Sequence, residues 1–298
     1  DIDNRALAEL ADQIHISAGT LVVFNTLNWR RNALVEADLG ENEELVDLTT
    51  HQPVPVDVLF NKENFRHVRF LASDIPAVGY KCFKIQSVTK LNSSPPEIDK
   101  NPVVENAYYR VTIDVRSGAI ESIFDKQLNR ELVDKYSAYK FGQYLYVTGG
   151  DGRTRMINPF NALPLGNLTI HPSANGEYLG TRKTCWGNSI ELRSTDVNTP
   201  TIQMEILLFN NEKKIEFRYN LQKKYMTTKE AVYFAFPIAA SSPQFEYATQ
   251  QGWVNPAKDM FKGASLEWFS IQKWMAVGDN GLTVGVVPVD APLASFGD

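Results

Sequence analysis

Beyond about residue 20 the sequence has almost no helical periodicity, and this feature restricts the possible folds more than any other. Apolar and polar residues alternate over short runs, for example at 108–115, and other runs, such as 231–236, are almost continuously apolar. Alternation with a period of two predicts strands with one buried face, whereas short apolar runs predict strands buried on both faces. The chain is therefore expected to be mainly β.

One helix is expected, at the start of the chain. Apolar residues there recur at a spacing of three and four, which predicts an amphipathic helix that ends before Ser17, Ala18 and Gly19. The residues that carry this pattern are Ala6, Leu7, Leu10, Ala11 and Ile14.

The next part of the chain predicts a small antiparallel β-sandwich over residues 18–90. Strands are expected at 20–25, 32–37, 53–60, 65–72 and 79–88. The run at 53–60 contains two prolines, which suit an edge strand because proline cannot donate a ladder hydrogen bond. A polar, proline-containing stretch at 90–97 predicts a linker.

A second, larger β region is expected over residues 98–298. Strands at 108–115 and 120–124 are separated by a turn, and 205–209 with 215–221 predicts a hairpin. The apolar runs at 231–236 and 282–287 predict strands buried on both faces. The chain stops within strand-like sequence, so this region is expected to be truncated at its C-terminal end.

Charge and composition argue against several classes of partner. The net charge is −5 and Lys and Arg are not clustered, so nucleic acid is not an expected partner. No apolar stretch reaches the roughly 20 residues of a membrane span, so no membrane partner is expected either. Cys82 and Cys185 are the only cysteines, which excludes a disulfide framework and predicts two buried thiols.

No metal or nucleophile motif is recognisable. His15, His51, His67 and His171 lie in none of the spacings that a zinc site uses, so neither a metal nor another cofactor is expected in this chain. No nucleophile elbow and no phosphate-binding glycine loop occurs. The sequence alone cannot select a pair of carboxylates for glycoside hydrolysis, although Glu267 and Asp290 stand beside aromatic or proline-containing segments.

Aromatic residues are the most suggestive chemical feature. They gather at 144–146, at Trp253, and at 268–269 with Trp274. Aromatic rings can stack on the apolar face of a sugar while polar neighbours bind its hydroxyls, and they can equally fill the core of a sandwich.

Several segments, in order, resemble the C-terminal β region of family 38 glycoside hydrolases, the α-mannosidases. The resemblance covers about residues 18–298 and is carried by VFNTLNW at 23–29, DIPAVGY at 74–80, ENAYYRV at 105–111 with the segment that follows it, GQYLY at 142–146, and EWF at 267–269 with DAPL at 290–293.

The resemblance implies a fold and a role. Residues 1–17 would end a helical bundle, and the larger β region would be a galactose-mutarotase-like β-supersandwich. The family's catalytic barrel, with its zinc site and catalytic aspartate, has no counterpart in this sequence. The implied function is therefore a non-catalytic region, inactive alone, of a retaining zinc-dependent α-mannosidase. Its partners would be the missing barrel and helical bundle, and α-mannoside glycans through the complete enzyme.

Three substrate-binding residues are expected from this resemblance. Tyr144 corresponds to the tyrosine that reaches the sugar site in the family, although Gln143 and Tyr146 depart from the family pattern. Trp268 and Asp290 are chosen for the segments in which they lie. The compartment stays unknown, with a secreted, periplasmic or lysosomal location favoured over a cytoplasmic one.

Three other interpretations stay open. The chain could be a stand-alone carbohydrate-binding β-sandwich module that holds a glycan by its own aromatic residues. It could be a purely structural β region, which differs from the main interpretation only in the role of Tyr144. A self-sufficient mutarotase or epimerase is disfavoured, because His171, which precedes a proline, is a poor general base.

Overall fold

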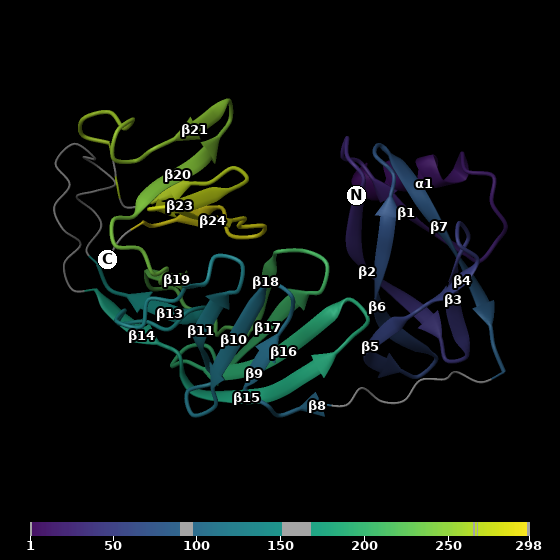
Figure 1. The fold of residues 1–298 in the computed structure, drawn as a ribbon, viewed down its shortest axis with the longest axis horizontal. Coiled ribbons are helices and arrows are strands. Elements are labelled where there is room, and N and C mark those ends of the chain that lie inside the picture. Colours follow the sequence, from purple (N-terminus) through teal and green to yellow (C-terminus); the bar gives the residue numbers. More distant parts are fainter. Residues whose placement is uncertain (1, 90–97, 151–167, 265, 267, 297–298) are drawn as a thin grey trace. The chain divides into compact units, whose positions relative to one another are not determined.

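A computed structural model gives the structure of the chain and describes residues 2–89, 98–150, 168–264, 266 and 268–296. The described residues form the helix α1 (Ile2–Asp12) and a series of antiparallel sheets (Figure 1). The prediction of a mainly β fold with one short N-terminal helix is confirmed. The predicted linker at 90–97 lies outside the described residues. No helix in the described part of the chain is long and apolar enough to cross a membrane.

The helix is shorter than the periodicity predicts. It ends at Asp12, and the amide of Ile14 closes a tighter turn on the carbonyl oxygen of Ala11 at 3.0 Å. Such a short-range bond commonly ends a helix.

Two compact units make up the chain. Unit 1 comprises Asp1–Asp99, Arg182–Ser189 and Leu208–Glu212, and unit 2 comprises Lys100–Thr181, Ile190–Leu207 and Lys213–Asp298.

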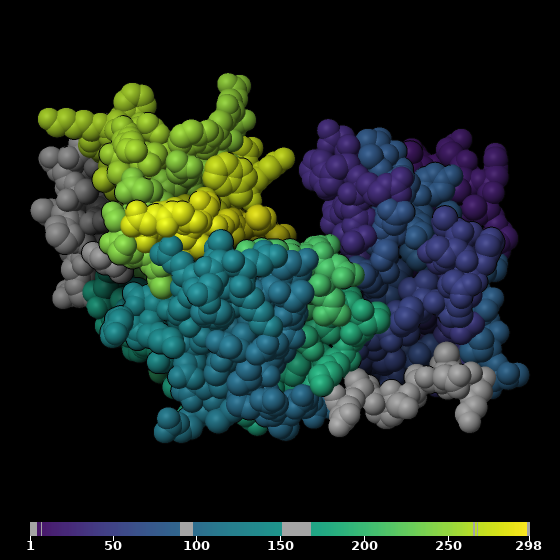
Figure 2. Space-filling model, viewed as in Figure 1, coloured from purple at the N-terminus to yellow at the C-terminus, as the bar shows by residue number. Residues whose placement is uncertain are grey.

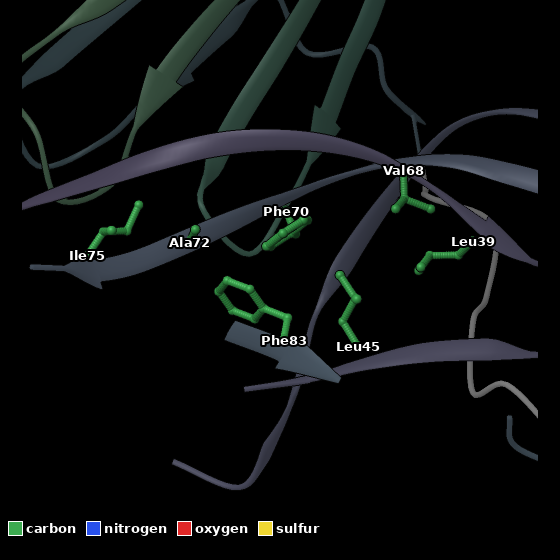
Figure 3. Close-up of a cluster of buried hydrophobic side chains, with 7 residues drawn as sticks. All are labelled: Leu39, Leu45, Val68, Phe70, Ala72, Ile75 and Phe83. Carbon is green, nitrogen blue, oxygen red and sulfur yellow. The ribbon is translucent and has the colours of Figure 1, made fainter. Parts of the chain in front are cut away.

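Unit 1 contains two antiparallel sheets, with strand orders β1-β7-β3-β4 and β2-β6-β5. The strands are β1 (Thr20–Asn25), β2 (Arg31–Gly40), β3 (Glu43–Asp47), β4 (Gln52–Val54), β5 (Val56–Lys62), β6 (Phe65–Ile75) and β7 (Gly79–Ser87). Buried side chains from both sheets form one core, in which the rings of Phe70 and Phe83 meet edge-on with centroids 5.1 Å apart (Figure 3).

The run at 53–60 is two strands rather than the one that the sequence predicts. Val54 pairs with Leu45 in one sheet, whereas Val56 pairs with Phe70 in the other. Pro55, between them, has no amide hydrogen to donate, so the ladder breaks there and the chain passes from one sheet to the other. Both β4 and β5 are edge strands, as expected for this sequence.

The strand orders in the second half of the chain are β12-β11-β10-β9, β14-β13-β19, β18-β17-β16-β15-β8, β21-β20-β23-β24 and β22-β25. The strands are β8 (Ile98–Asp99), β9 (Val103–Glu105), β10 (Tyr109–Asp114), β11 (Ala119–Asp125), β12 (Arg130–Glu131), β13 (Gln143–Thr148), β14 (Thr169–Pro172), β15 (Ala174–Lys183), β16 (Gly187–Thr195), β17 (Thr201–Phe209), β18 (Ile215–Gln222), β19 (Glu230–Ala235), β20 (Gln244–Thr249), β21 (Gly252–Val254), β22 (Phe269–Ser270), β23 (Met275–Asp279), β24 (Leu282–Val286) and β25 (Leu293–Ala294).

A close backbone approach in unit 2 requires glycine. A Cβ atom at Gly176 would lie 1.6 Å from the carbonyl oxygen of Ser117, far inside van der Waals contact. Gly118, in the turn between β10 and β11, has a φ of +57° and equally little space beside the amide of Glu177. The absence of side chains at these positions lets this turn lie directly against β15.

The burial predictions for two strands and for the two cysteines are wrong. β24 is an edge strand with Thr283 and Gly285 exposed, so it is not buried on both faces, and β19 is only partly buried along its length. Cys185 is exposed because it lies in the turn after β15, where its neighbour Trp186 takes the buried position, and Cys82 is only partly buried.

Candidate functional site

The candidate site is built around β13, the strand that carries the GQYLY sequence. It lies between β14 and β19 in a three-stranded sheet. Strand alternation places Tyr144 and Tyr146 on one face, and Leu145 and Val147 on the other. All four side chains are buried, so both faces of β13 are covered.

Tyr144 lies inside the core of unit 2. Its side chain is 1% exposed, and it packs in a cluster with Tyr146 and Ile202. Its ring meets that of Phe234 edge-on, with centroids 5.9 Å apart. The hydroxyl shares a 2.7 Å hydrogen bond with the hydroxyl of Thr199, which is fully buried. Burial raises the pKa of the Tyr144 phenol, so this group is neutral and already has a partner.

Tyr146, two residues further on, belongs to a polar cluster at the end of the same face. Its hydroxyl donates to Glu230 at 2.8 Å, and the amide of Asn198 donates to the same carboxylate at 3.2 Å. The ammonium of Lys223 also binds Glu230 and lies 5.8 Å from the centre of the Tyr146 ring. His171, the cross-strand partner of Tyr146, lies beside it with ring centroids 6.0 Å apart.

In this cluster the positive charge of Lys223 compensates the negative charge of Glu230. The hydrogen bond from Lys223, followed by that from Tyr146, lowers the pKa of Glu230, while the carboxylate of Glu230 raises the pKa of Tyr146. Glu230 is therefore ionised and Tyr146 is neutral at neutral pH. Such a carboxylate can accept hydrogen bonds and position its neighbours, but it is poorly suited to act as a general acid.

Trp268 and Asp290 lie on the surface. Trp268 is 45% exposed, and its indole nitrogen donates to the hydroxyl of Tyr233 at 2.7 Å. Because Tyr233 pairs with Leu145, its side chain lies on the face of the sheet opposite Tyr144. Asp290 is exposed and has no hydrogen-bond or ion-pair partner within the described chain. The structure thus does not bring the three predicted residues together on one face, and Glu267 lies outside the described residues.

Sequence reasoning missed the partners of Tyr146. Glu230, Lys223 and Asn198 come from segments 52 or more residues further along the chain than Tyr146. Nothing in the local sequence pattern marks them, since polar residues beside strands are common. The pairing of β13 with β19 brings Glu230 to Tyr146, and Asn198, between β16 and β17, and Lys223, after β18, contact the same carboxylate.

The four histidines do not meet in a metal site. Among the residues that the structure describes, no group of three or more His, Cys, Asp or Glu side chains could hold a metal ion. His67 instead lies between two acids, with Nδ1 2.6 Å from Asp38 and Nε2 3.3 Å from Glu36. These hydrogen bonds, that to Asp38 first, raise the pKa of the imidazole.

Comparison with known families identifies the class of protein. A sequence model of the C-terminal domain of family 38 glycosyl hydrolases matches residues 104–290, most of the chain. The chain therefore belongs to the family 38 glycosyl hydrolases, and the matched part corresponds to their C-terminal domain. None of the curated proteins matches the chain.

Solved structures agree on the fold. An α-mannosidase from Enterococcus faecalis V583 is similar with a TM-score of 0.63 and 12% sequence identity, over 95% of this chain and 39% of that protein. A family 38 glycosyl hydrolase from Enterococcus faecalis is similar with a TM-score of 0.57 and 12% identity, over 93% of this chain and 39% of the other. The chain thus spans about two fifths of the length of these relatives.

Proposed function

We propose that this chain is the non-catalytic C-terminal β region of an α-mannosidase. The match of residues 104–290 to the family 38 C-terminal domain carries the proposal, and the α-mannosidase from Enterococcus faecalis V583 with a similar fold supports it. In the complete enzyme the reaction would be a retaining, zinc-dependent hydrolysis of α-mannosides. The described residues offer no cluster suited to zinc, so no step through the metal is assigned to this chain.

The first role of the region would be to pack against the rest of the enzyme. Unit 2 exposes several large apolar side chains between residues 261 and 293, and the late part of the chain lies at the surface in Figure 2. These are Phe261, Leu266, Val287, Val289 and Leu293. Exposed apolar side chains favour burial against a partner, and the partner proposed here is the catalytic part of the same enzyme.

The second role would be to contribute a wall of the sugar site. Trp268 offers an exposed indole and Asp290 an exposed carboxylate without a partner in the described chain, which suit ring stacking and hydroxyl binding. Tyr144 is buried in the core, so it can join this wall only if the packing around it opens and its hydroxyl exchanges Thr199 for a sugar hydroxyl. The proposal therefore assigns direct contact first to Trp268 and Asp290.

The test is hydrolysis of a chromogenic α-mannoside. We expect no turnover by the 298-residue chain, and turnover above a contamination control would overturn the non-catalytic assignment. In the complete enzyme, Trp268→Ala and Asp290→Asn should raise KM, whereas Trp29→Ala, which removes another exposed tryptophan, should not. Unchanged KM for both variants would refute the sugar-wall role and leave the packing role to be tested by association of the separated parts.

A further inference from the structure

The four-stranded sheet β21-β20-β23-β24 has two very different faces. One face is part of the unit 2 core, where Tyr247, with its cross-strand partners Val254 and Met275, packs against Phe269. Strand alternation turns the intervening residues to the opposite face.

Two tryptophans flank a small residue on that opposite face. Trp253 on β21 is the direct partner of Ala248 on β20. Trp274 immediately precedes Met275, and its carbonyl oxygen accepts a 2.8 Å hydrogen bond from the amide of Ala248. Trp253 is 58% exposed and Trp274 is 37% exposed, while Ala248 between them is only 7% exposed. With two strand spacings between them, their backbones are about 10 Å apart.

A carboxylate lies beside this pair. Glu246 precedes Ala248 by two residues on β20, so it shares the face with the tryptophans, and it is only partly exposed. Within the described chain Glu246 has no hydrogen-bond or ion-pair partner. Its neighbours across the sheet are small, since it pairs with Ala276 and Ala276 pairs with Gly285. A Cβ atom at Gly285 would meet nothing within 4 Å, so the sheet is open at Gly285, two strands from Glu246.

We propose that this face binds a glycan, with pyranose rings stacked on Trp253 and Trp274 and ring hydroxyls donating to Glu246. An indole offers a flat apolar surface to the C–H face of a sugar, and a carboxylate can accept two neighbouring hydroxyls. An apolar protein surface docked here would bury an unpaired carboxylate, which is costly. Sugar hydroxyls supply the donors that Glu246 lacks, so the chemistry favours a glycan as the occupant.

The spacing of the tryptophans makes the expected ligand an oligosaccharide. Backbones about 10 Å apart leave room for one ring on each indole, so a trisaccharide should bind more tightly than a monosaccharide. That a glycan binds is inferred from this sheet, whereas the choice of α-linked mannose as its sugar rests on the proposed function.

The experiment is titration calorimetry of the 298-residue chain with an α-linked mannotriose and with methyl α-mannopyranoside. Mannitol, which has similar hydroxyls but no ring face, is the ligand control. We expect Trp253→Ala and Trp274→Ala each to weaken mannotriose binding about three- to tenfold. Glu246→Gln should weaken it by a similar factor, about three- to tenfold, because it removes a charged acceptor.

Trp29→Ala is the matched control, since this indole is 57% exposed but lies in unit 1. It should leave mannotriose binding unchanged, and thermal melting should verify that every variant is folded. No binding of mannotriose, equal binding of mannitol, or binding that survives loss of both Trp253 and Trp274 would each overturn the proposal. Absence of α-mannosidase activity in the complete enzyme, with mannotriose binding intact, would count against the proposed function instead.

Discussion

Replacing Tyr144 by phenylalanine would remove one hydroxyl from the core of unit 2 and leave the ring in place. The lost group shares a 2.7 Å hydrogen bond with the hydroxyl of Thr199, and both side chains are almost completely buried. No water can easily replace the missing partner in such a packed place. The Thr199 hydroxyl would therefore be buried without its partner.

The magnitude follows from that unpaired hydroxyl. Leaving a buried donor or acceptor unsatisfied costs about 1–3 kcal/mol, whereas removing both partners together is nearly neutral. Tyr144→Phe should thus lower the free energy of unfolding by about 1–3 kcal/mol. Thr199→Val should cost a similar amount, and the double variant should cost clearly less than the sum of the two.

Urea unfolding measures all three variants, with melting temperature as a second readout. A loss of 1 kcal/mol lowers the melting temperature by about 2–4 °C in a domain of about 200 residues. Tyr136→Phe is the matched control, because Tyr136 is fully at the surface, and it should have no effect. A Tyr144→Phe variant as stable as the parent chain, or a double variant with fully additive losses, would refute the reasoning.

Two further predictions concern other parts of the chain. Asp38 and Glu36 raise the pKa of His67. The stability that protonated His67 contributes is therefore present below its unfolded pKa and is lost as pH rises through the raised folded pKa. His67→Gln should remove this pH dependence of the urea midpoint, and an unchanged dependence would contradict the prediction. Gly176→Ala should lower the free energy of unfolding by about 3 kcal/mol or more, because the new Cβ atom meets a backbone oxygen. The control is Gly285→Ala, where space is open, and this variant should have a melting temperature close to that of the parent chain. Similar melting temperatures of the two variants would contradict the prediction and show that the turn against β15 yields easily.

Much of the secondary structure could be read from local patterns. Alternation at 108–115 predicts β10, the hairpin of β17 and β18 follows from two apolar runs around a polar turn, and the apolar spacing before Asp12 predicts α1. These succeed because alternation and helical spacing are properties of neighbouring residues. Pro55 shows the limit: its missing amide predicts an edge strand, but only the sheet pairings show that the chain changes sheets there.

The candidate sites depended on the tertiary structure. The sequence by itself determined a mainly β chain, the resemblance to family 38, and the alternation that puts Tyr144 and Tyr146 on one face of a strand. It could not determine which face is covered, because that depends on strands brought together from distant parts of the chain. Only the tertiary structure buried Tyr144 against Thr199, placed Glu230 beside Tyr146, and set Trp253 and Trp274 on either side of Ala248.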